Sequence, residues 1–442
     1  MPEMSRRTFL DGLAVTVAGT ALAAPARSYA QIVGANNRVN FATAGLNGRG
    51  RAHLSAIANN TKNGARMTHY CDVDKNVLAK FGPEAEKTLG YAPTANQDFR
   101  KALESKDVDA ITIATPDHWH APMAVLGLKA GKHVYVEKPS SHNPREGELL
   151  IAAQKKYGKL EQVGDQQRSS DHTIKIVNDI HSGRIGRAYY AKTWYVNTRK
   201  SMGIGKPIPV PANLDWDLWQ GPAPRSEYKD NIHPYNWHWL TRYGTGETLN
   251  NGTHEVDIAR WALGLEWPER INCSGGRFAY KDDWQFPDTI VTNFEYPEHM
   301  ISWECRCSNG MKVYGRDRGT TVHGTNGSVL VDRQGYEVYD LNGKKTDEFV
   351  ASKDRFVSSD TIGRDSMTDA HFANFIAGIQ KGEQLHSPIT VANTSVTILQ
   401  ISNIAFDLKR ELTLDTSNGH IKDAEAMKRW GREYQKGWEV TV

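Results

Sequence analysis

A lysine at the end of a short strand is the residue of this chain best placed to do chemistry. Lys138 follows the β-branched and aromatic residues 134–136, and Pro139 favours an extended backbone at the residue before it. Ligands of open α/β sheets bind beyond the carboxyl ends of the strands, so an ammonium group there can reach a bound substrate and cofactor. A solvated cap on a buried strand is the alternative, and it would be preferred for an isolated Glu-Lys-Pro tripeptide.

A glycine-rich turn earlier in the chain resembles a phosphate-binding loop. Residues 45–50 (GLNGRG) match the pattern G-x-G-x-x-G at its first and third glycines, Gly45 and Gly50, with Asn47 in place of the second glycine and Gly48 directly after it. Glycines permit a tight turn and a close approach of backbone N–H groups to a pyrophosphate at a helix N-terminus. Asparagine tolerates left-handed backbone angles, so we expect the turn to survive the substitution.

An aspartate lies at the spacing from this turn that is typical of a ribose ligand. Asp72 comes 22 residues after Gly50 and ends a second strand, residues 65–71. A carboxylate there can bind both ribose hydroxyls and repel a 2′-phosphate, which favours NAD over NADP. The alternative is that Asp72 only caps the helix that follows.

The order of the elements predicts the fold. Strands are expected at 38–44, 65–71 and 108–114, alternating with helices at 51–58, 119–130 and 145–157. Such alternation predicts a doubly wound parallel sheet. From about residue 187 longer alternating runs take over, at 188–197, 270–280, 289–296, 300–307 and 328–331. We therefore predict an α/β protein with a Rossmann domain over 36–160, followed over 161–442 by a substrate-binding α+β domain with a large, mainly antiparallel open sheet.

The first thirty residues predict an export signal and not a part of the fold. Residues 5–10 (SRRTFL) resemble a twin-arginine signal, followed by an apolar run over 13–24 and a cleavage-like site at 28–30. The apolar run is shorter than the ~18 residues that span a bilayer, so stable membrane insertion is not expected. We expect a periplasmic or otherwise exported protein.

Charge and cysteine content narrow the function further. The formal charge of +3 and the lack of a basic run give no support for nucleic-acid binding. The four cysteines have no metal-ligand spacing. Among Cys273, Cys305 and Cys307 both a disulfide and a set of reduced, buried thiols are open.

Four motifs in order resemble the Gfo/Idh/MocA oxidoreductases. They are the glycine-rich turn with Asp72, residues 115–120 (TPDHWH), residues 137–139 (EKP) and residues 252–261 (GTHEVDIARW). The resemblance covers nearly all of the chain after the export signal. It implies NAD or NADP in the first domain and hydride transfer at a secondary alcohol of a sugar or cyclitol.

The resemblance also assigns roles to residues. The cofactor contacts that it implies are those of the turn, including Arg49, together with Asp72, Thr115, Pro116, His118, His120, Glu137 and Lys138. Lys138 matches the family's catalytic lysine and His254 the proposed acid/base. Asn250 stands where many members have an aspartate, four residues before that histidine. An amide cannot ionise or stabilise an imidazolium as a carboxylate does, so the proton relay is in question.

The same residues suit alcohol oxidation on chemical grounds. Hydride removal requires a group that accepts the hydroxyl proton, and a histidine is suited to this. Lys138 would hold the alcohol oxygen and stabilise negative charge on it. Asp257, three residues after His254, could orient the ring or pair with Arg260. A satisfied core histidine is the alternative for His254.

Further residues are candidates for substrate contact. Seven of the 12 tryptophans lie between residues 194 and 267, and of these Trp237 is a candidate for stacking on a sugar. Arg168, Asn197, Arg199, Asn250 and Asp257 complete the substrate set. His118 and His120 form an i, i+2 pair, but no carboxylate or thiolate completes a metal site, so none is predicted.

These observations predict an exported, NAD-dependent oxidoreductase of sugars, glycosides or cyclitols that carries tightly bound NAD and forms a homo-oligomer. One alternative is a redox-neutral glycosidase or epimerase that oxidises a ring hydroxyl only transiently. A second is a non-catalytic carbohydrate-binding or partner protein.

Overall fold

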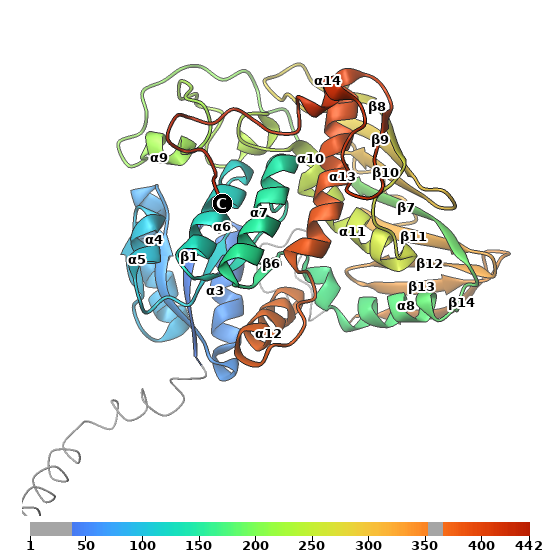
Figure 1. Ribbon diagram of the computed structural model, residues 1–442, viewed down its shortest axis with the longest axis horizontal. Helices are drawn as coiled ribbons and strands as arrows, with labels where there is room; N and C mark the ends of the chain where they lie inside the picture. Colours follow the sequence, from blue (N-terminus) through green and yellow to red (C-terminus); the bar gives the residue numbers. More distant parts are fainter. Residues whose placement is uncertain (1–37, 352–365) are drawn as a thin grey trace, which may run out of the picture. The chain divides into compact units, whose positions relative to one another are not determined.

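The computed structural model describes residues 38–351 and 366–442. The predicted export signal, residues 1–30, lies outside the described residues. Two sheets organise the rest, and the prediction of a parallel sheet followed by a mainly antiparallel one is confirmed (Figure 1).

The first sheet is parallel throughout, in the order β3-β2-β1-β4-β5-β6. Its strands are β1 (Val39–Ala44), β2 (Ala65–Cys71), β3 (Thr94–Asn96), β4 (Ala110–Ile113), β5 (His133–Val136) and β6 (Glu161–Val163). The helices between them are α3 (Arg49–Asn59), α4 (Lys75–Leu89), α5 (Phe99–Glu104), α6 (Asp117–Lys129) and α7 (Pro144–Tyr157). β4 is buried along its whole length, as expected of a strand that helices cover on both faces. The strand order reverses between β1 and β4, which is where such sheets bind ligands.

The second sheet has the order β14-β13-β12-β11-β7-β10-β9-β8-β15. Its strands are β7 (Ala188–Val196), β8 (Arg270–Gly276), β9 (Thr289–Glu295), β10 (Met300–Arg306), β11 (Arg318–Gly324), β12 (Gly327–Asp332), β13 (Gly335–Tyr339), β14 (Lys345–Val350) and β15 (Leu412–Thr413). β7 and β10 pair in parallel, whereas the other neighbours are antiparallel. Four strands of this sheet, β11, β13, β14 and β15, were absent from the sequence prediction, and β8 ends four residues before the predicted residue 280.

The remaining helices cover the second sheet and return to the first. They are α8 (Asp171–His181), α9 (Trp216–Gln220), α10 (Gly246–Asn250), α11 (Gly252–Leu263), α12 (Ser366–Lys381), α13 (Ile389–Leu408) and α14 (Ala424–Met427). α11 lies on β7, and α13 packs on α7, α11 and β8. α12 packs on α3 and β1 (Figure 1). There the rings of Phe372 and Phe375 contact that of Phe41. The end of the chain thus helps to cover the parallel sheet.

Among the described residues, α13 alone is long and apolar enough to cross a membrane by length and composition. In its most apolar stretch, 78% of the residues are buried inside the protein.

All four cysteines are free thiols. Cys71, Cys305 and Cys307 are buried and Cys273 is half-buried. Of the two states left open by the sequence, the structure has the reduced one.

Candidate functional site

A cavity lies beyond the carboxyl ends of β1, β2, β4 and β5, where the strand order predicts a ligand. Its walls include the glycine-rich turn, the ends of four parallel strands and the first turn of α11. The residues that line it and that the sequence singled out are Gly45, Asn47, Gly48, Arg49, Asp72, Thr115, Pro116, His120, Glu137, Lys138, Arg199, Trp237, Asn250 and His254.

The glycine-rich turn needs two of its glycines for close packing. A Cβ on Gly45, which has a φ of +82°, would lie 2.5 Å from the carbonyl oxygen of Ala114, and one on Gly50 would lie 2.0 Å from that of Gly45. Gly48 precedes α3 and supplies no side-chain cap, and the first turn of α3 has no acidic residue. The helix N-terminus is therefore suited to a pyrophosphate.

Asn47 does not use the left-handed conformation considered for it. Among the described non-glycine residues, only Tyr314 and Lys409 have a positive φ. The middle position of this turn therefore does not require a glycine for its backbone angles.

Asp72 joins the end of β2 to the glycine-rich turn. Its Oδ2 accepts a hydrogen bond from the Leu46 N–H and its Oδ1 one from the Asp74 N–H, both at 3.0 Å. The N-cap of α4 is Asp74, which accepts from the N–H of Asn76, so Asp72 is not the helix cap. Burial raises the pKa of Asp72 to about 6.

Glu137 anchors the residues beneath the turn. Its carboxylate accepts hydrogen bonds from Arg49 Nε at 2.8 Å and Gln166 Nε2 at 3.0 Å, and it lies 2.9 Å from His53 Nε2. Burial opposes ionisation, but Arg49 and His53 outweigh it and hold the pKa of Glu137 well below its usual value. Glu137 is thus an anion that orients Arg49 beside the cavity.

Lys138 points across the cavity to the segment before α11. Its Nζ donates to the backbone oxygen of Asn250 at 2.5 Å and to Asn250 Oδ1 at 3.2 Å. Burial lowers the pKa of Lys138 to about 8, against the opposing effects of Glu137 and Asp117. The side chain therefore stays an ammonium at neutral pH.

His254 lies in the first turn of α11 and is 5% exposed. Burial lowers its pKa well below the usual value, and the nearby cations Arg333 and Lys138 lower it further. The ring is therefore neutral at physiological pH, which is the form that accepts a proton.

Asp257 has a different partner from the two that were predicted. It accepts from Arg168 Nε at 2.5 Å, from Arg168 Nη2 at 3.0 Å and from Ser395 Oγ at 2.7 Å. It forms no hydrogen bond with the His254 ring, and Arg260 pairs with Glu266 instead. Arg168 and Asp257 form a buried ion pair away from the residues that line the cavity.

Three other predicted site residues also lie away from the cavity wall. The ring nitrogens of His118 lie 3.0 Å from the carbonyl oxygen of Trp219 and 3.3 Å from that of Tyr243. Asn197 binds the Tyr195 hydroxyl, and Gly50 packs inside the turn. His118 is a packing residue because the 198–245 segment closes over it.

His120 lines the cavity but its ring is already engaged. Its Nδ1 lies 2.6 Å from the carbonyl oxygen of Pro139 and its Nε2 lies 2.8 Å from that of Thr115. The ring thus braces the ends of β4 and β5. Among the described residues no group of three or more His, Cys, Asp or Glu side chains could hold a metal ion.

Several cavity residues carried no recognisable signal in the sequence. Arg318 on β11 and Arg333 after β12 reach the cavity from the second sheet, and His238 reaches it from the short 3-10 helix Asn236–Trp239. None belongs to a spaced motif. Only the pairing of β11 and β12 with the rest of the sheet brings the two arginines to this place.

The 198–245 segment runs from the second sheet to the first and is hydrogen-bonded beside Asp72. The N–H of Asp215 donates to the Val73 carbonyl at 3.1 Å, and that of Lys75 donates to the Asn213 carbonyl at 2.9 Å. Leu218 and Trp219, which follow, line the cavity. The segment therefore forms a wall of the cavity next to the predicted ribose site.

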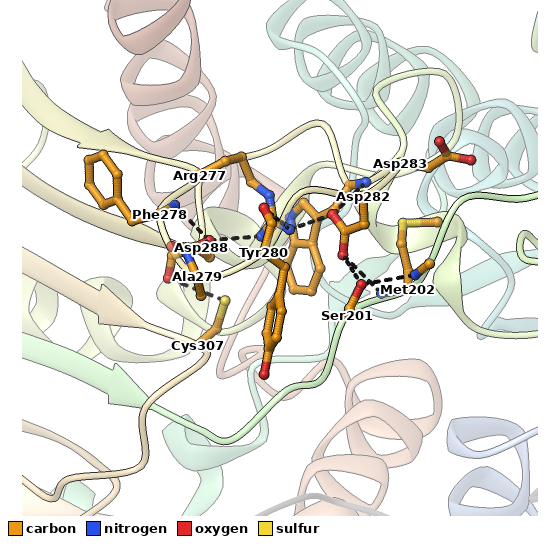
Figure 2. A network of polar contacts seen from close by, with 12 residues as sticks. Ser201, Met202, Arg277, Phe278, Ala279, Tyr280, Asp282, Asp283, Asp288 and Cys307 are labelled. Carbon is orange, nitrogen blue, oxygen red and sulfur yellow. Dashed lines mark hydrogen bonds and ion pairs between the residues drawn. The ribbon is translucent and has the colours of Figure 1, made fainter.

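A second anchor holds the start of this segment, as Figure 2 shows. Asp282 Oδ2 accepts from Ser201 Oγ at 2.7 Å and from the Met202 N–H at 3.0 Å. Arg277 pairs with Asp282 at 2.5 Å and with Asp288 at 3.0 Å. The segment is thus held at its start and again at residues 213–215.

Comparison with known families identifies the chain. The family described as "Oxidoreductase family, NAD-binding Rossmann fold" matches residues 39–165, and the "GFO/IDH/MocA C-terminal domain" matches residues 175–330. The protein belongs to the Gfo/Idh/MocA oxidoreductase family. Residues 39–165, which contain the first sheet, form an NAD-binding Rossmann domain. Its cofactor is NAD.

Named relatives are similar over part of their length. Levoglucosan dehydrogenase of Pseudarthrobacter phenanthrenivorans is 24% identical over 282 residues, which are 58% of this chain and 64% of that protein. "Glycosyl hydrolase family 109 protein 2" of Shewanella sp. (strain ANA-3) is 30% identical over 224 residues, 45% of this chain and 47% of that protein. The matched regions span roughly half the length of these relatives.

A solved structure shows the same fold. Levoglucosan dehydrogenase in complex with NADH and levoglucosan has a TM-score of 0.65 and 17% identity, covering 85% of this chain and 99% of that one.

NAD fits the cavity on features of this chain. The glycines of the turn leave room for a close backbone approach, and Asp72 faces the same cavity. Thr115 also lines it, and its Oγ1 is a buried hydroxyl without a hydrogen-bond partner among the described residues. A bound polar ligand would satisfy such a group.

Proposed function

We propose that this protein is an NAD-dependent oxidoreductase that transfers hydride at a secondary hydroxyl of a sugar, glycoside or cyclitol. The observation that carries the proposal is that Lys138 and His254 share one cavity with the glycine-rich turn and Asp72. The similarity to levoglucosan dehydrogenase supports this substrate class.

The side chains divide the work of alcohol oxidation. NAD, when bound, supplies the hydride acceptor. The Lys138 ammonium donates to the alcohol oxygen and stabilises its negative charge as the C–H bond breaks. A ring nitrogen of the neutral His254 takes the hydroxyl proton, so the alcohol loses a hydride and a proton in total. An ammonium has three N–H donors, so Lys138 Nζ can donate to the substrate oxygen and keep its hydrogen bonds to Asn250.

The experiment is a substrate screen with two readouts. Purified protein with NAD is incubated with free sugars, cyclitols and glycosides, and both NADH and carbonyl product are quantified. We expect both to form together with at least one alcohol. NADH formation without a carbonyl product would contradict the proposed reaction.

A redox-neutral cleavage of glycosides is the second candidate. The glycosyl hydrolase family 109 relative, 30% identical over 45% of this chain, favours it. In that case a glycoside would release free sugar with catalytic NAD and no net NADH. Parallel assays of free sugar and of absorbance at the nicotinamide band separate the two candidates.

We also propose that NAD travels with the protein and stays bound. The support is the twin-arginine-like sequence at residues 5–10 and the hydrogen bonds that hold the 198–245 segment beside Asp72. Retention through purification requires a dissociation constant well below micromolar, or more than ~8 kcal/mol of binding free energy. Protein purified without nucleotide is denatured, and the supernatant is analysed for NAD(H). Cofactor-free protein would contradict retention and, with it, the exported role.

The homo-oligomer stays a prediction, which light scattering of the purified protein tests.

A further inference from the structure

A buried glutamate stands directly behind Asn250. Glu247 lies on α10, three residues before Asn250, and is 1% exposed. Its Oε2 accepts from Arg199 Nε at 2.5 Å. Its Oε1 accepts from Asn250 Nδ2 at 3.2 Å and also from Asn251 Nδ2. Glu247 does not line the cavity, whereas Arg199, Asn250 and Asn251 do.

The amide of Asn250 connects this carboxylate to Lys138. Its Oδ1 accepts from Lys138 Nζ at 3.2 Å, and its Nδ2 donates to Glu247. An ammonium can only donate and a carboxylate can only accept, so the two partners fix the amide in this orientation. The result is a chain from Glu247 through Asn250 to Lys138.

We propose that Glu247 is a positioning residue for Lys138, supplying through Asn250 the carboxylate charge that the amide at position 250 lacks. The inference rests on the proposed role of Lys138 in hydride transfer. It also assigns one carboxylate to two cations of the cavity, because Glu247 holds Arg199 directly and Lys138 through the amide.

The groups that face Lys138 show what removal of this charge would do. Glu137, Asp117 and Glu247 favour the ammonium, whereas burial and Arg333 disfavour it. The uncharged His254 and His238 lie nearby and contribute no opposing charge. Loss of Glu247 therefore lowers the pKa of Lys138 and also frees the amide of Asn250 to rotate.

The test compares Glu247→Gln with a double variant. Glu247→Gln keeps an oxygen for Arg199 but removes the charge. We expect the high-pH limb of hydride transfer to move down by about one pH unit, which lowers the rate at pH 7.5 by about threefold. The double variant adds Asn250→Asp, which places a carboxylate directly next to Lys138. We expect the high-pH limb of its rate profile to return to the wild-type pH or above.

Asp288→Asn is the matched control. Asp288 is fully buried and pairs with Arg277 at 3.0 Å, outside the residues that line the cavity (Figure 2). It should lower thermal stability and leave the high-pH limb in place. The inference would be overturned if the high-pH limb of hydride transfer in Glu247→Gln stayed at the wild-type pH. It would also be overturned if the limb moved down and the added Asn250→Asp substitution did not restore it.

A second readout does not depend on the reaction. Acetic anhydride labels only neutral amines, so the labelling of Lys138 against pH, measured by mass spectrometry in NAD-free protein, reports its pKa. We expect the midpoint to move down in Glu247→Gln and back in the double variant. If no sugar is oxidised but the midpoints move, the proposed function fails and the Glu247 contact stands. A labelling midpoint of Lys138 that is the same in Glu247→Gln as in the wild-type protein overturns the inference, whether or not the protein oxidises a sugar.

Discussion

The two ends of the cavity are built differently. At the cofactor end the glycine-rich turn, Asp72 and Thr115 follow β1, β2 and β4, and each is placed by the strand directly before it. At the substrate end Lys138 meets Asn250 and His254, more than a hundred residues later in the chain, with Arg333 reaching in from the second sheet. The cofactor end therefore depends on local backbone geometry, and the substrate end on how the two sheets pack.

The largest expected effect comes from Lys138→Met, which separates chemistry from cofactor binding. The variant removes the ammonium and roughly keeps the volume. We expect hydride transfer to fall by at least ~100-fold with NAD affinity little changed. Single-turnover kinetics and NAD titration measure the two quantities. Near-normal turnover would show that Lys138 does no chemistry.

Asp72→Ala should change NAD binding and leave hydride transfer nearly unchanged, the opposite of Lys138→Met. Loss of the predicted ribose contact should weaken NAD binding by about 10-fold and narrow the preference over NADP, with chemistry at saturating NAD nearly unchanged. Titration of cofactor-free protein with both nucleotides measures this. An unaltered NAD/NADP ratio would leave Asp72 only its hydrogen bonds to Leu46 and Asp74.

The pH dependence gives smaller effects that again differ between the ends. Lys138 has a pKa of about 8 and must be protonated, so hydride transfer should be constant below that pH and fall about tenfold per unit above it. Asp72 has a pKa of about 6 and binds ribose as the anion, so NAD affinity should weaken as the pH falls through 6. His254 is neutral throughout this range and should add no acidic limb. A rate limb below pH 7 that persists at saturating NAD would contradict the neutral His254.

The same contrast explains what the sequence could predict. Gly45, Asp72 and Lys138 were placed from the strands before them, because parallel strands bring their carboxyl ends to one edge. The roles predicted for Arg168 and Asp257 did not anticipate their mutual ion pair, because spacing along a helix does not show which partner arrives from another element. No sequence motif predicts a role for Glu247, because its connection to Lys138 depends on the hydrogen bonds of Asn250 to both residues.

The central claim is that one cavity oxidises a sugar hydroxyl with NAD at Lys138. The most direct measurement mixes NAD-loaded protein with alcohols deuterated at the ring carbons, including levoglucosan and myo-inositol, then quenches with acid and analyses the nucleotide by mass spectrometry. We predict deuterium in the nucleotide for the wild-type protein with at least one of these alcohols, and at least ~100-fold slower transfer in Lys138→Met. Equal deuterium transfer in both proteins, or NAD-loaded protein whose nucleotide gains none from any alcohol, would contradict the account.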